Sequence, residues 1–155
     1  MGRATEIIRL ERGDTGLVND LLTVFADAFD EPEIYNDRRP DGGYLDRVLG
    51  SDACIVLAAV QGQRIVGGLV AYELPKIEQA RSEIYIYDLA VVTDARRQGI
   101  ATRLIRQLQR IAAERGAWVI FVQADHGDDA AIALYSKLGT REDVLHFDID
   151  VGHVN

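Results

Sequence analysis

The order of strand and helix patterns along the chain predicts an α/β fold, built on one mixed β-sheet that is flanked by helices. Two apolar runs, 53–60 and 117–124, are typical of buried strands. Between them, residues 100–112 carry apolar side chains at helical spacing. The chain has 155 residues, which is the usual length of one domain. We therefore expect a single domain over residues 1–155.

The first half of the chain alternates between helical and strand periodicity. Leu17, Leu21 and Val24 lie at helical spacing, whereas the polar segment after Phe29 contains two prolines and is typical of a loop. In order, the expected elements are a strand at 6–10, a helix at 15–29, a loop at 30–40, a short helix at 43–49, a strand at 53–60, a hairpin turn at 61–63 and a strand at 64–74.

The second half begins with a long strand pattern and contains an amphipathic helix. Ile100, Leu104 and Leu108 lie on one face of this helix, and Arg103 and Arg106 lie on the other. In order, the expected elements are a strand at 82–92, the helix that starts near 100, a strand at 117–124, a helix at 128–138 that ends at Gly139, and a final strand at 143–150 with alternating apolar and acidic residues.

The acidic composition argues against nucleic acid as the main partner, because the formal net charge is −8. The charge is unevenly distributed. Residues 51–120 carry 7 acids and 9 bases, whereas residues 1–50 carry 11 acids and 6 bases, and residues 121–155 carry 7 acids and 2 bases. The acidic flanks suit a cationic substrate, or else form a solvated surface without a specific role.

The single cysteine, Cys54, excludes an internal disulfide framework and fits a reducing compartment. It lies in an apolar run, so we expect a buried structural thiol rather than a nucleophile. No run of about 18 apolar residues predicts a membrane span, and the first residues lack the apolar core of a signal peptide. We therefore expect a cytoplasmic protein that has no membrane partner.

The segment 82–101 is the most informative for function. A strand pattern ends in a turn, and the residues RRQGIA at 96–101 open the amphipathic helix. Free backbone N–H groups and the positive end of the helix dipole favour an anion at such a helix start. Gly99 allows the backbone to approach a ligand closely, and the two arginines add positive charge. The sequence predicts a phosphate-binding loop here; the alternative is an ordinary strand–turn–helix connection.

The spacing Arg96-x-x-Gly99-x-Ala101 resembles the loop with which the GNAT superfamily of N-acetyltransferases holds the pyrophosphate of acetyl-CoA. The segment QADHGDDAAIALYSKLG at 123–139 is similar to a second motif of that superfamily, except that Asp128 stands where asparagine is more usual. A carboxylate still caps a helix, but it lacks the amide N–H that would bind pantetheine. The resemblance implies the GNAT fold, in which the fourth and fifth strands of a central mixed sheet splay apart.

Longer segments resemble the type I aminoglycoside 3-N-acetyltransferases, which modify gentamicin-like antibiotics. These segments are SEIYIYDLAV at 82–91, RRQGIATRLI at 96–105, VQADHGDDAAIALYSKLG at 122–139 and HFDID at 146–150. The resemblance implies acetyl transfer from acetyl-CoA to the 3-amino group of a 2-deoxystreptamine aminoglycoside, a reaction that confers antibiotic resistance. It is also compatible with a homodimer, and nothing in the sequence places an interface.

The resemblance also implies where acetyl-CoA would bind. Unpaired backbone N–H groups near the end of the fourth strand would hold pantetheine and the thioester oxygen. The implied cofactor-binding residues are Ala90, Val91, Val92, Arg96, Arg97, Gln98, Gly99, Ile100, Ala101, Thr102, Asp128 and Ala131. No metal is expected, because the cluster DHGDD at 125–129 lacks a further set of His or Cys ligands.

Asp88 and Tyr135 are the candidates for proton transfer. Asp88 is a carboxylate in an otherwise apolar strand, and as a base it would take a proton from the substrate amine directly or through water. The alternative is a structural carboxylate that pairs with an arginine or with backbone N–H groups. Tyr135 is the implied general acid for the leaving thiolate; the alternative is a ring packed in the core. Tyr85 and Tyr87 are expected on the face opposite Asp88, in the core.

Further acidic side chains are candidate contacts for the ammonium groups of a substrate. Asp125 follows the fifth expected strand, where ligands often bind in open α/β sheets. Glu83 lies at the start of the fourth strand. Asp148 and Asp150 are expected to complete an acidic cleft with Asp88.

Two other functions stay open at this point. One is an acetyltransferase of the same fold that acts on a polyamine or another cationic amine. The other is a non-catalytic acyl-CoA-binding module, which would bind the coenzyme without turnover. For an enzyme, we expect direct attack of the amine on the thioester within a ternary complex, because Cys54 lies in a predicted core strand and is a poor candidate for an acyl-enzyme.

Overall fold

The computed structural model describes residues 3–152, which form two compact units. The first unit ends at Gln123 and contains the whole sheet, and the second begins at Ala124 and contains the helix nearest the C-terminus. No helix within 3–152 combines the length and the hydrophobicity that crossing a membrane requires. The single domain over 1–155 stays a prediction.

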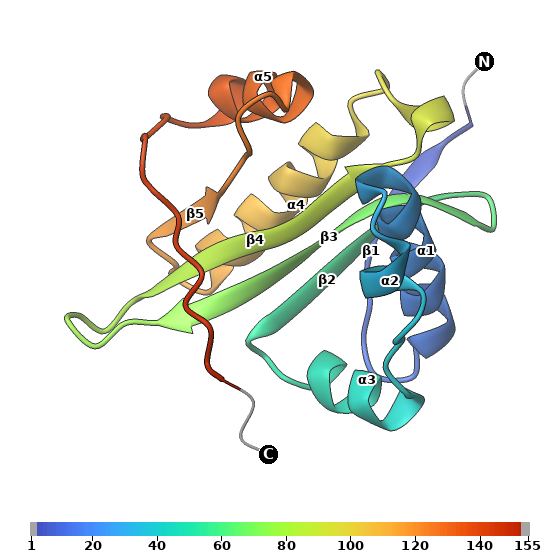
Figure 1. The fold of residues 1–155 in the computed structure, drawn as a ribbon, viewed down its shortest axis with the longest axis horizontal. Helices are drawn as coiled ribbons and strands as arrows, with labels where there is room; N and C mark the ends of the chain where they lie inside the picture. The colour runs from blue at the N-terminus through green and yellow to red at the C-terminus, as the bar shows by residue number, and fades with distance from the viewer. Residues whose placement is uncertain (1–2, 153–155) are drawn as a thin grey trace. The chain divides into compact units, whose positions relative to one another are not determined.

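The first unit is built on a five-stranded sheet in the order β1-β2-β3-β4-β5 (Figure 1). The strands are β1 (Thr5–Arg9), β2 (Cys54–Gln61), β3 (Arg64–Pro75), β4 (Ser82–Val91) and β5 (Val119–Val122). Neighbouring strands from β1 to β4 pair antiparallel, whereas β5 runs parallel to β4. The sheet is therefore mixed, and the predicted fold class is confirmed.

Helices cover both faces of this sheet. The helices of the first unit are α1 (Thr15–Phe29), α2 (Pro32–Tyr35), α3 (Gly42–Leu49), a short 3-10 helix (Thr93–Ala95) and α4 (Ile100–Glu114). The second unit contains α5 (Asp129–Leu138). Leu21 and Phe25 of α1 share a buried cluster with Val56 and Ala58 of β2. Since alternate strand residues face opposite sides, the buried Leu57 faces the other side, where α4 packs against β2, β3 and β4.

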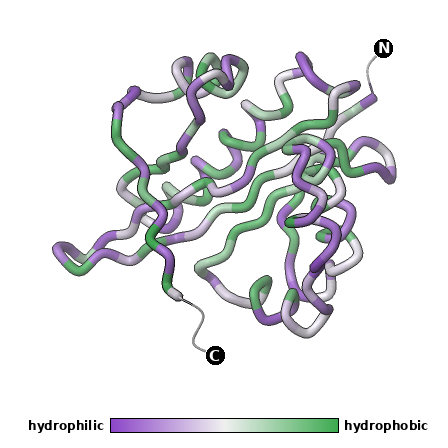
Figure 2. Tube along the Cα trace, in the orientation of Figure 1, coloured by the Kyte–Doolittle hydropathy of each residue, from purple (hydrophilic) through white to green (hydrophobic). Residues whose placement is uncertain are grey.

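The hydrophobic residues of the first unit follow the central strands, and hydrophilic residues gather in the helices and turns (Figure 2). The helix that follows β4 illustrates the pattern. Leu104 and Leu108 of α4 are fully buried, whereas Arg106 and Arg110 are exposed. The helical periodicity of the sequence thus predicted correctly which face of α4 contacts the sheet.

A β-bulge in β4 changes which side chains accompany Asp88. Val70 of β3 pairs with Asp88, but the next residue, Ala71, pairs with Ile86, so Tyr87 is an extra residue. Val70 and Tyr72 are two residues apart on β3, so their side chains lie on the same face of the sheet. Their partners on β4, Asp88 and Tyr85, therefore also share that face. The predicted core positions of the two tyrosines are wrong, since Tyr87 is 64% exposed and Tyr85 is half-buried.

Two further expectations differ from the structure. The segment 30–40, predicted as a loop, contains the short helix α2, which begins with Pro32, a residue that suits the first helical position. The strand predicted at 143–150 is wrong, because the described residues after Leu138 form no strand. Its apolar side chains are exposed, Leu145 by 84%. Alternating residues form a strand only where a neighbouring strand satisfies their backbone groups.

Candidate active site

Asp88 lies half-buried on β4 and accepts a hydrogen bond from a tyrosine of α2. The hydroxyl of Tyr35 donates to Oδ1 of Asp88 over 2.8 Å. No ion pair among the described residues involves Asp88, so the structure offers no arginine as its partner. One carboxylate oxygen is therefore held by a neutral donor.

The surroundings of Asp88 raise its proton affinity. Burial raises the pKa of Asp88 above its ordinary value of 3.8, the hydrogen bond from Tyr35 lowers it, and the carboxylate of Glu31 raises it again. The net shift is upward. A base whose pKa lies closer to neutrality takes a proton from an ammonium group more readily than an ordinary carboxylate does. Such a shift marks a candidate functional group.

Three tyrosine rings lie next to Asp88 on the same face of the sheet. The ring of Tyr87 makes edge contacts with Tyr72, at 6.1 Å between centroids, and with Tyr85, at 5.6 Å. Burial raises the pKa of Tyr72 to about 12, so its hydroxyl stays neutral. A carboxylate flanked by aromatic rings suits a cation that carries apolar surface.

Glu83, at the start of β4, has a partner of its own. Its carboxylate lies 3.8 Å from the ammonium group of Lys76. The pair is partly exposed, so the contact is weak. Glu83 therefore stays available as a predicted substrate contact.

The pairing of β4 with β5 ends before Asp88. β5 pairs only with the four residues of β4 from Glu83 to Ile86. The following residues of β4 pair with β3 on one side and have no described strand on the other. Backbone groups of β4 next to the candidate base therefore have no described strand partner on that side.

The donors at this open edge differ in part from those expected. The N–H of Val92 donates to the carbonyl of Val66 over 2.8 Å, so the expectation that it is unpaired is wrong. Residues of an antiparallel strand alternate in the side to which their N–H points. Ala90, two residues before Val92, therefore points its N–H toward β3, whereas Leu89 and Val91 point theirs toward the open edge. Leu89 is not among the expected donors, because the resemblance implied three consecutive residues, 90–92, and not the alternation of the strand.

The loop before α4 has the backbone geometry of an anion site. Arg97 and Gly99 both have positive φ, 62° and 74°, and left-handed residues in such a turn bring successive N–H groups to one concave side. A Cβ atom on Gly99 would meet nothing within 4 Å, so the space over the loop is open. The first N–H groups of α4, at Ile100, Ala101 and Thr102, have no acceptor within the helix.

Two side chains of this loop form hydrogen bonds with strands of the sheet. Nε of Arg96 donates to the carbonyl of Val91 over 3.1 Å, and Oε1 of Gln98 accepts from the amide of Gln61 over 3.0 Å. Arg97 is exposed. Arg96 is exposed as well, so the open concave backbone with two exposed arginines fits a diphosphate group.

The second unit contains the other proton-transfer candidate. The carboxylate of Asp128 accepts from the N–H of Ala131 over 3.2 Å and caps α5, which confirms the predicted capping role. Tyr135 is half-buried on α5. Burial raises the pKa of Tyr135 to about 12, with a smaller contribution from Asp128. Its hydroxyl is therefore a proton donor at neutral pH.

The remaining predicted substrate contacts also belong to the second unit. Asp148 forms an exposed pair with His146 at 2.9 Å, and Asp150 accepts from the N–H of Gly152 at 3.0 Å. Asp125 is exposed in the turn before α5. Since Asp88 belongs to the first unit, the acidic cleft that would join these residues stays a prediction.

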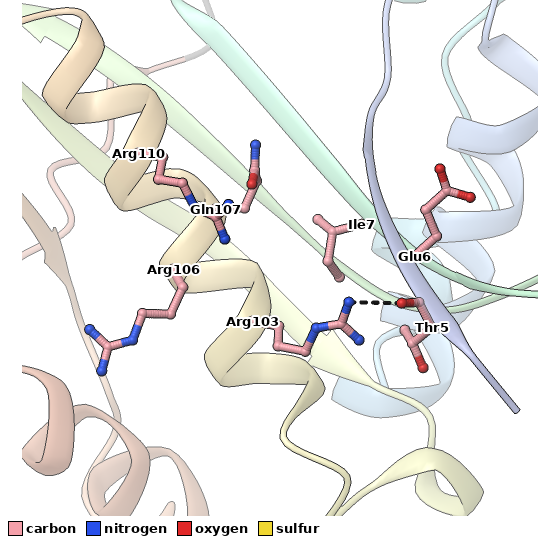
Figure 3. A pocket seen from close by; sticks show the side chains of 7 residues that line it. All are labelled: Thr5, Glu6, Ile7, Arg103, Arg106, Gln107 and Arg110. Carbon is pink, nitrogen blue, oxygen red and sulfur yellow. Dashed lines mark hydrogen bonds between the residues drawn. The ribbon is translucent and has the colours of Figure 1, made fainter. Parts of the chain in front are cut away.

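Two features of the first unit lie outside this site. A groove of about 440 Å³ between β1 and α4 is basic, with three arginines of α4 along it, and Arg103 donates to the carbonyl of Thr5 over 2.8 Å (Figure 3). No predicted site residue lines it. Cys54 is buried, as predicted, and burial raises the pKa of its thiol. Within the described part of the chain, no three His, Cys, Asp or Glu side chains are grouped closely enough to hold a metal ion.

Solved structures of aminoglycoside acetyltransferases are similar to this chain over almost its whole length. One, from an uncultured soil metagenomic sample, is 54% identical, with a TM-score of 0.94 over 96% of this chain and 99% of that one. Another, also from an uncultured soil metagenomic sample and in complex with sisomicin, is 33% identical, with a TM-score of 0.86 over 96% of this chain and 97% of that one.

Sequence comparison points to the same family. The probable N-acetyltransferase camello of Xenopus laevis is 26% identical over 98 residues, which cover 63% of this chain and 43% of that protein. The chain thus matches less than half the length of this curated relative. The model of the acetyltransferase (GNAT) family matches residues 18–140. With the mixed sheet and the loop before α4, this match shows that the chain belongs to the GNAT acetyltransferase family.

Proposed function

We propose that this chain is an acetyl-CoA-dependent N-acetyltransferase that acetylates an amine of an aminoglycoside antibiotic. The observation that carries the proposal is the half-buried Asp88, which has a raised pKa and no cationic partner among the described residues, beside the open edge of β4. The 54% identity to an aminoglycoside acetyltransferase supports the substrate class.

The proposed chemistry is one direct transfer. Asp88 takes a proton from the substrate ammonium group, directly or through water, and the free amine attacks the thioester carbonyl. A C–N bond forms, the C–S bond breaks, and the leaving thiolate takes a proton from the hydroxyl of Tyr135. The acylated nitrogen then loses its second proton, which restores the hydroxyl of Tyr135. The buried Cys54 has no part in the reaction, so no acyl-enzyme is needed.

The coenzyme supplies the activated acetyl group, and backbone groups of the chain hold it. The N–H groups of Leu89 and Val91 point to the open edge of β4 and serve pantetheine and the thioester oxygen. The loop residues from Arg96 to Thr102 serve the diphosphate. Asp128 and Ala131, at the start of α5, are predicted contacts as well.

The proposed acceptor is the 3-amino group of the 2-deoxystreptamine ring in a gentamicin-like aminoglycoside. The tyrosine rings beside Asp88 offer apolar surface to a sugar ring. Glu83, Asp125, Asp148 and Asp150 are the proposed partners of further ammonium groups. A homodimer stays a prediction.

Release of coenzyme A thiol from acetyl-CoA tests the proposal. The purified protein is mixed with a panel of aminoglycosides and polyamines, and NMR of the product identifies the acetylated nitrogen. We expect turnover with aminoglycosides and acetylation of the 3-amino group. Turnover with polyamines but not with aminoglycosides would mean that the substrate is a polyamine, and the proposed substrate class would be wrong. Coenzyme binding by calorimetry without thiol release for any amine would indicate a non-catalytic module.

A further inference from the structure

We infer that Tyr35 is a positioning residue, whose hydroxyl fixes one oxygen of Asp88 so that the other oxygen points to the substrate amine. This inference rests on the proposed role of Asp88 as the base. It gives α2 a function in the candidate site, although the sequence of the segment 30–40 predicts only a loop.

The two oxygens of the Asp88 carboxylate have different surroundings. Among the described residues, the only hydrogen bond to the side chain of Asp88 is the one from Tyr35, which reaches Oδ1. The carboxylate has a second oxygen with lone pairs, and an ammonium group is a suitable donor to it. A base held through one oxygen keeps its orientation while the other oxygen exchanges protons.

The ring of Tyr35 is held by the core of the first unit. It lies 6.0 Å from the ring of Phe25 and 5.6 Å from that of Phe29, both on α1. Phe25 is 1% exposed. Such aromatic contacts fix the direction of the ring, and therefore the place of the hydroxyl relative to β4.

A single guanidinium group links the backbone carbonyl of Tyr35 to α1. Nε of Arg39 donates to the carbonyl of Tyr35 over 2.9 Å. The same group donates to the carbonyl of Asn19 over 2.9 Å and to the hydroxyl of Thr23 over 2.7 Å, both on α1. A further hydrogen bond of 2.7 Å reaches the side chain of Asn36. Arg39 thus ties α2 to α1.

Several titratable groups face the carboxylate of Asp88. Glu31 precedes α2 and raises the pKa of Asp88. Tyr72 on β3 and Tyr85 on β4 have pKa values that burial raises, with a smaller contribution from the charge of Asp88. The hydroxyl of Tyr35 lowers the pKa of Asp88, and its own pKa is raised, first by burial and then by Asp88. Tyr35 is therefore the neighbour that opposes the effect of burial on the pKa of Asp88.

The test compares the pH dependence of kcat/KM for Tyr35→Phe and for the wild-type enzyme. Phenylalanine keeps the ring contacts and removes only the hydroxyl. Without its hydrogen bond the pKa of Asp88 rises, so the acid limb of the profile should move up by about one pH unit. The KM for acetyl-CoA should stay unchanged, because Tyr35 is not among the residues assigned to the coenzyme.

Tyr44→Phe is the matched control. Tyr44 is 48% exposed on α3, and the described residues form no hydrogen bond with its hydroxyl. The same chemical change there should leave the profile in place. A uniform loss of activity in Tyr35→Phe at every pH, with a lower melting temperature and an unmoved acid limb, would mean that Tyr35 is merely structural and would overturn the inference.

Carboxyl ¹³C NMR titration separates this inference from the proposed function, because it follows Asp88 without turnover. A higher titration midpoint for Asp88 in Tyr35→Phe, together with the moved acid limb, supports the inference. An unchanged midpoint overturns it, whatever the activity. If the midpoint moves but Asp88→Asn retains wild-type turnover, the proposed base is wrong, and Tyr35 then positions no catalytic group.

Discussion

At the scale of single residues, Asp88 combines an ionisable group with an environment that disfavours its charge. The folded protein binds a proton at Asp88 more tightly than the unfolded chain does, because burial raises its pKa above 3.8. By linkage, the contribution of Asp88 to folding is most favourable below its unfolded pKa and declines as the pH rises through its folded pKa. The charge required of a base therefore opposes stability.

Asp88→Asn should accordingly lose activity and gain stability. The amide cannot take a proton, so we expect kcat/KM to fall by roughly 10²–10⁴-fold. It carries no charge and still accepts from Tyr35, so the melting temperature at pH 7–8 should exceed that of the wild type. The difference should shrink as the pH falls toward 4, and thermal melts across this range measure it. A less stable variant at pH 8 would contradict the assigned environment.

At the scale of elements, the start of α4 depends on one backbone conformation. Gly99 has a φ of 74° and open space where a Cβ would lie. Gly116, just after α4, has a φ of 69° and similarly open space. The two glycines have the same conformational requirement at opposite ends of one helix, so they form a matched pair for mutation.

Gly99→Ala should weaken acetyl-CoA binding, whereas Gly116→Ala should not. Each change places an L-residue in the left-handed region and costs about 1–2 kcal/mol of stability. Only the change at Gly99 lies in the loop assigned to the diphosphate, and we expect its dissociation constant to rise roughly tenfold. Calorimetry measures both affinities, and equal affinities in the two folded variants would remove the loop from the coenzyme site.

Periodicity in the sequence predicted the elements that bury one regular face. α1 and α4 and the strands β2 to β4 appear close to their expected bounds, because burial imposes a period that is visible in the residues. Irregularities of the backbone were not predicted. The extra residue at Tyr87 leaves the apolar pattern unbroken, and the polar residues around Pro32 conceal a helix of one turn.

The candidate site was predictable only in part. Asp88 is visible as an acid inside an apolar strand. Its partner Tyr35 is 53 positions away in the sequence, and no local pattern links the two. Arg39 is equally hidden, because its hydrogen bonds reach back to Asn19 and Thr23 on another helix. Contacts between distant segments follow from packing, which a single sequence does not contain.

At the scale of the whole molecule, the net charge of −8 should assist capture of a polycationic substrate. Attraction between exposed charges is screened beyond about 10 Å at 0.1 M salt. We therefore expect added salt to raise the KM for an aminoglycoside well before it changes kcat, in steady-state assays at fixed pH. Asp125→Asn should raise the same KM without affecting acetyl-CoA. Efficient turnover of an anionic analogue would contradict this account.

The bulge at Tyr87 also marks a place where the length of β4 can vary during evolution. Removal of Tyr87 would restore regular pairing with β3, because the neighbours Val70 and Ala71 would then pair with consecutive residues of β4. Ile84 and Ile86, now 0% and 2% exposed, would stay in the core, and Asp88 would stay on its present face. In an alignment of homologues, a gap of one residue is therefore expected at 87, and a homologue with that gap should retain the acid that corresponds to Asp88.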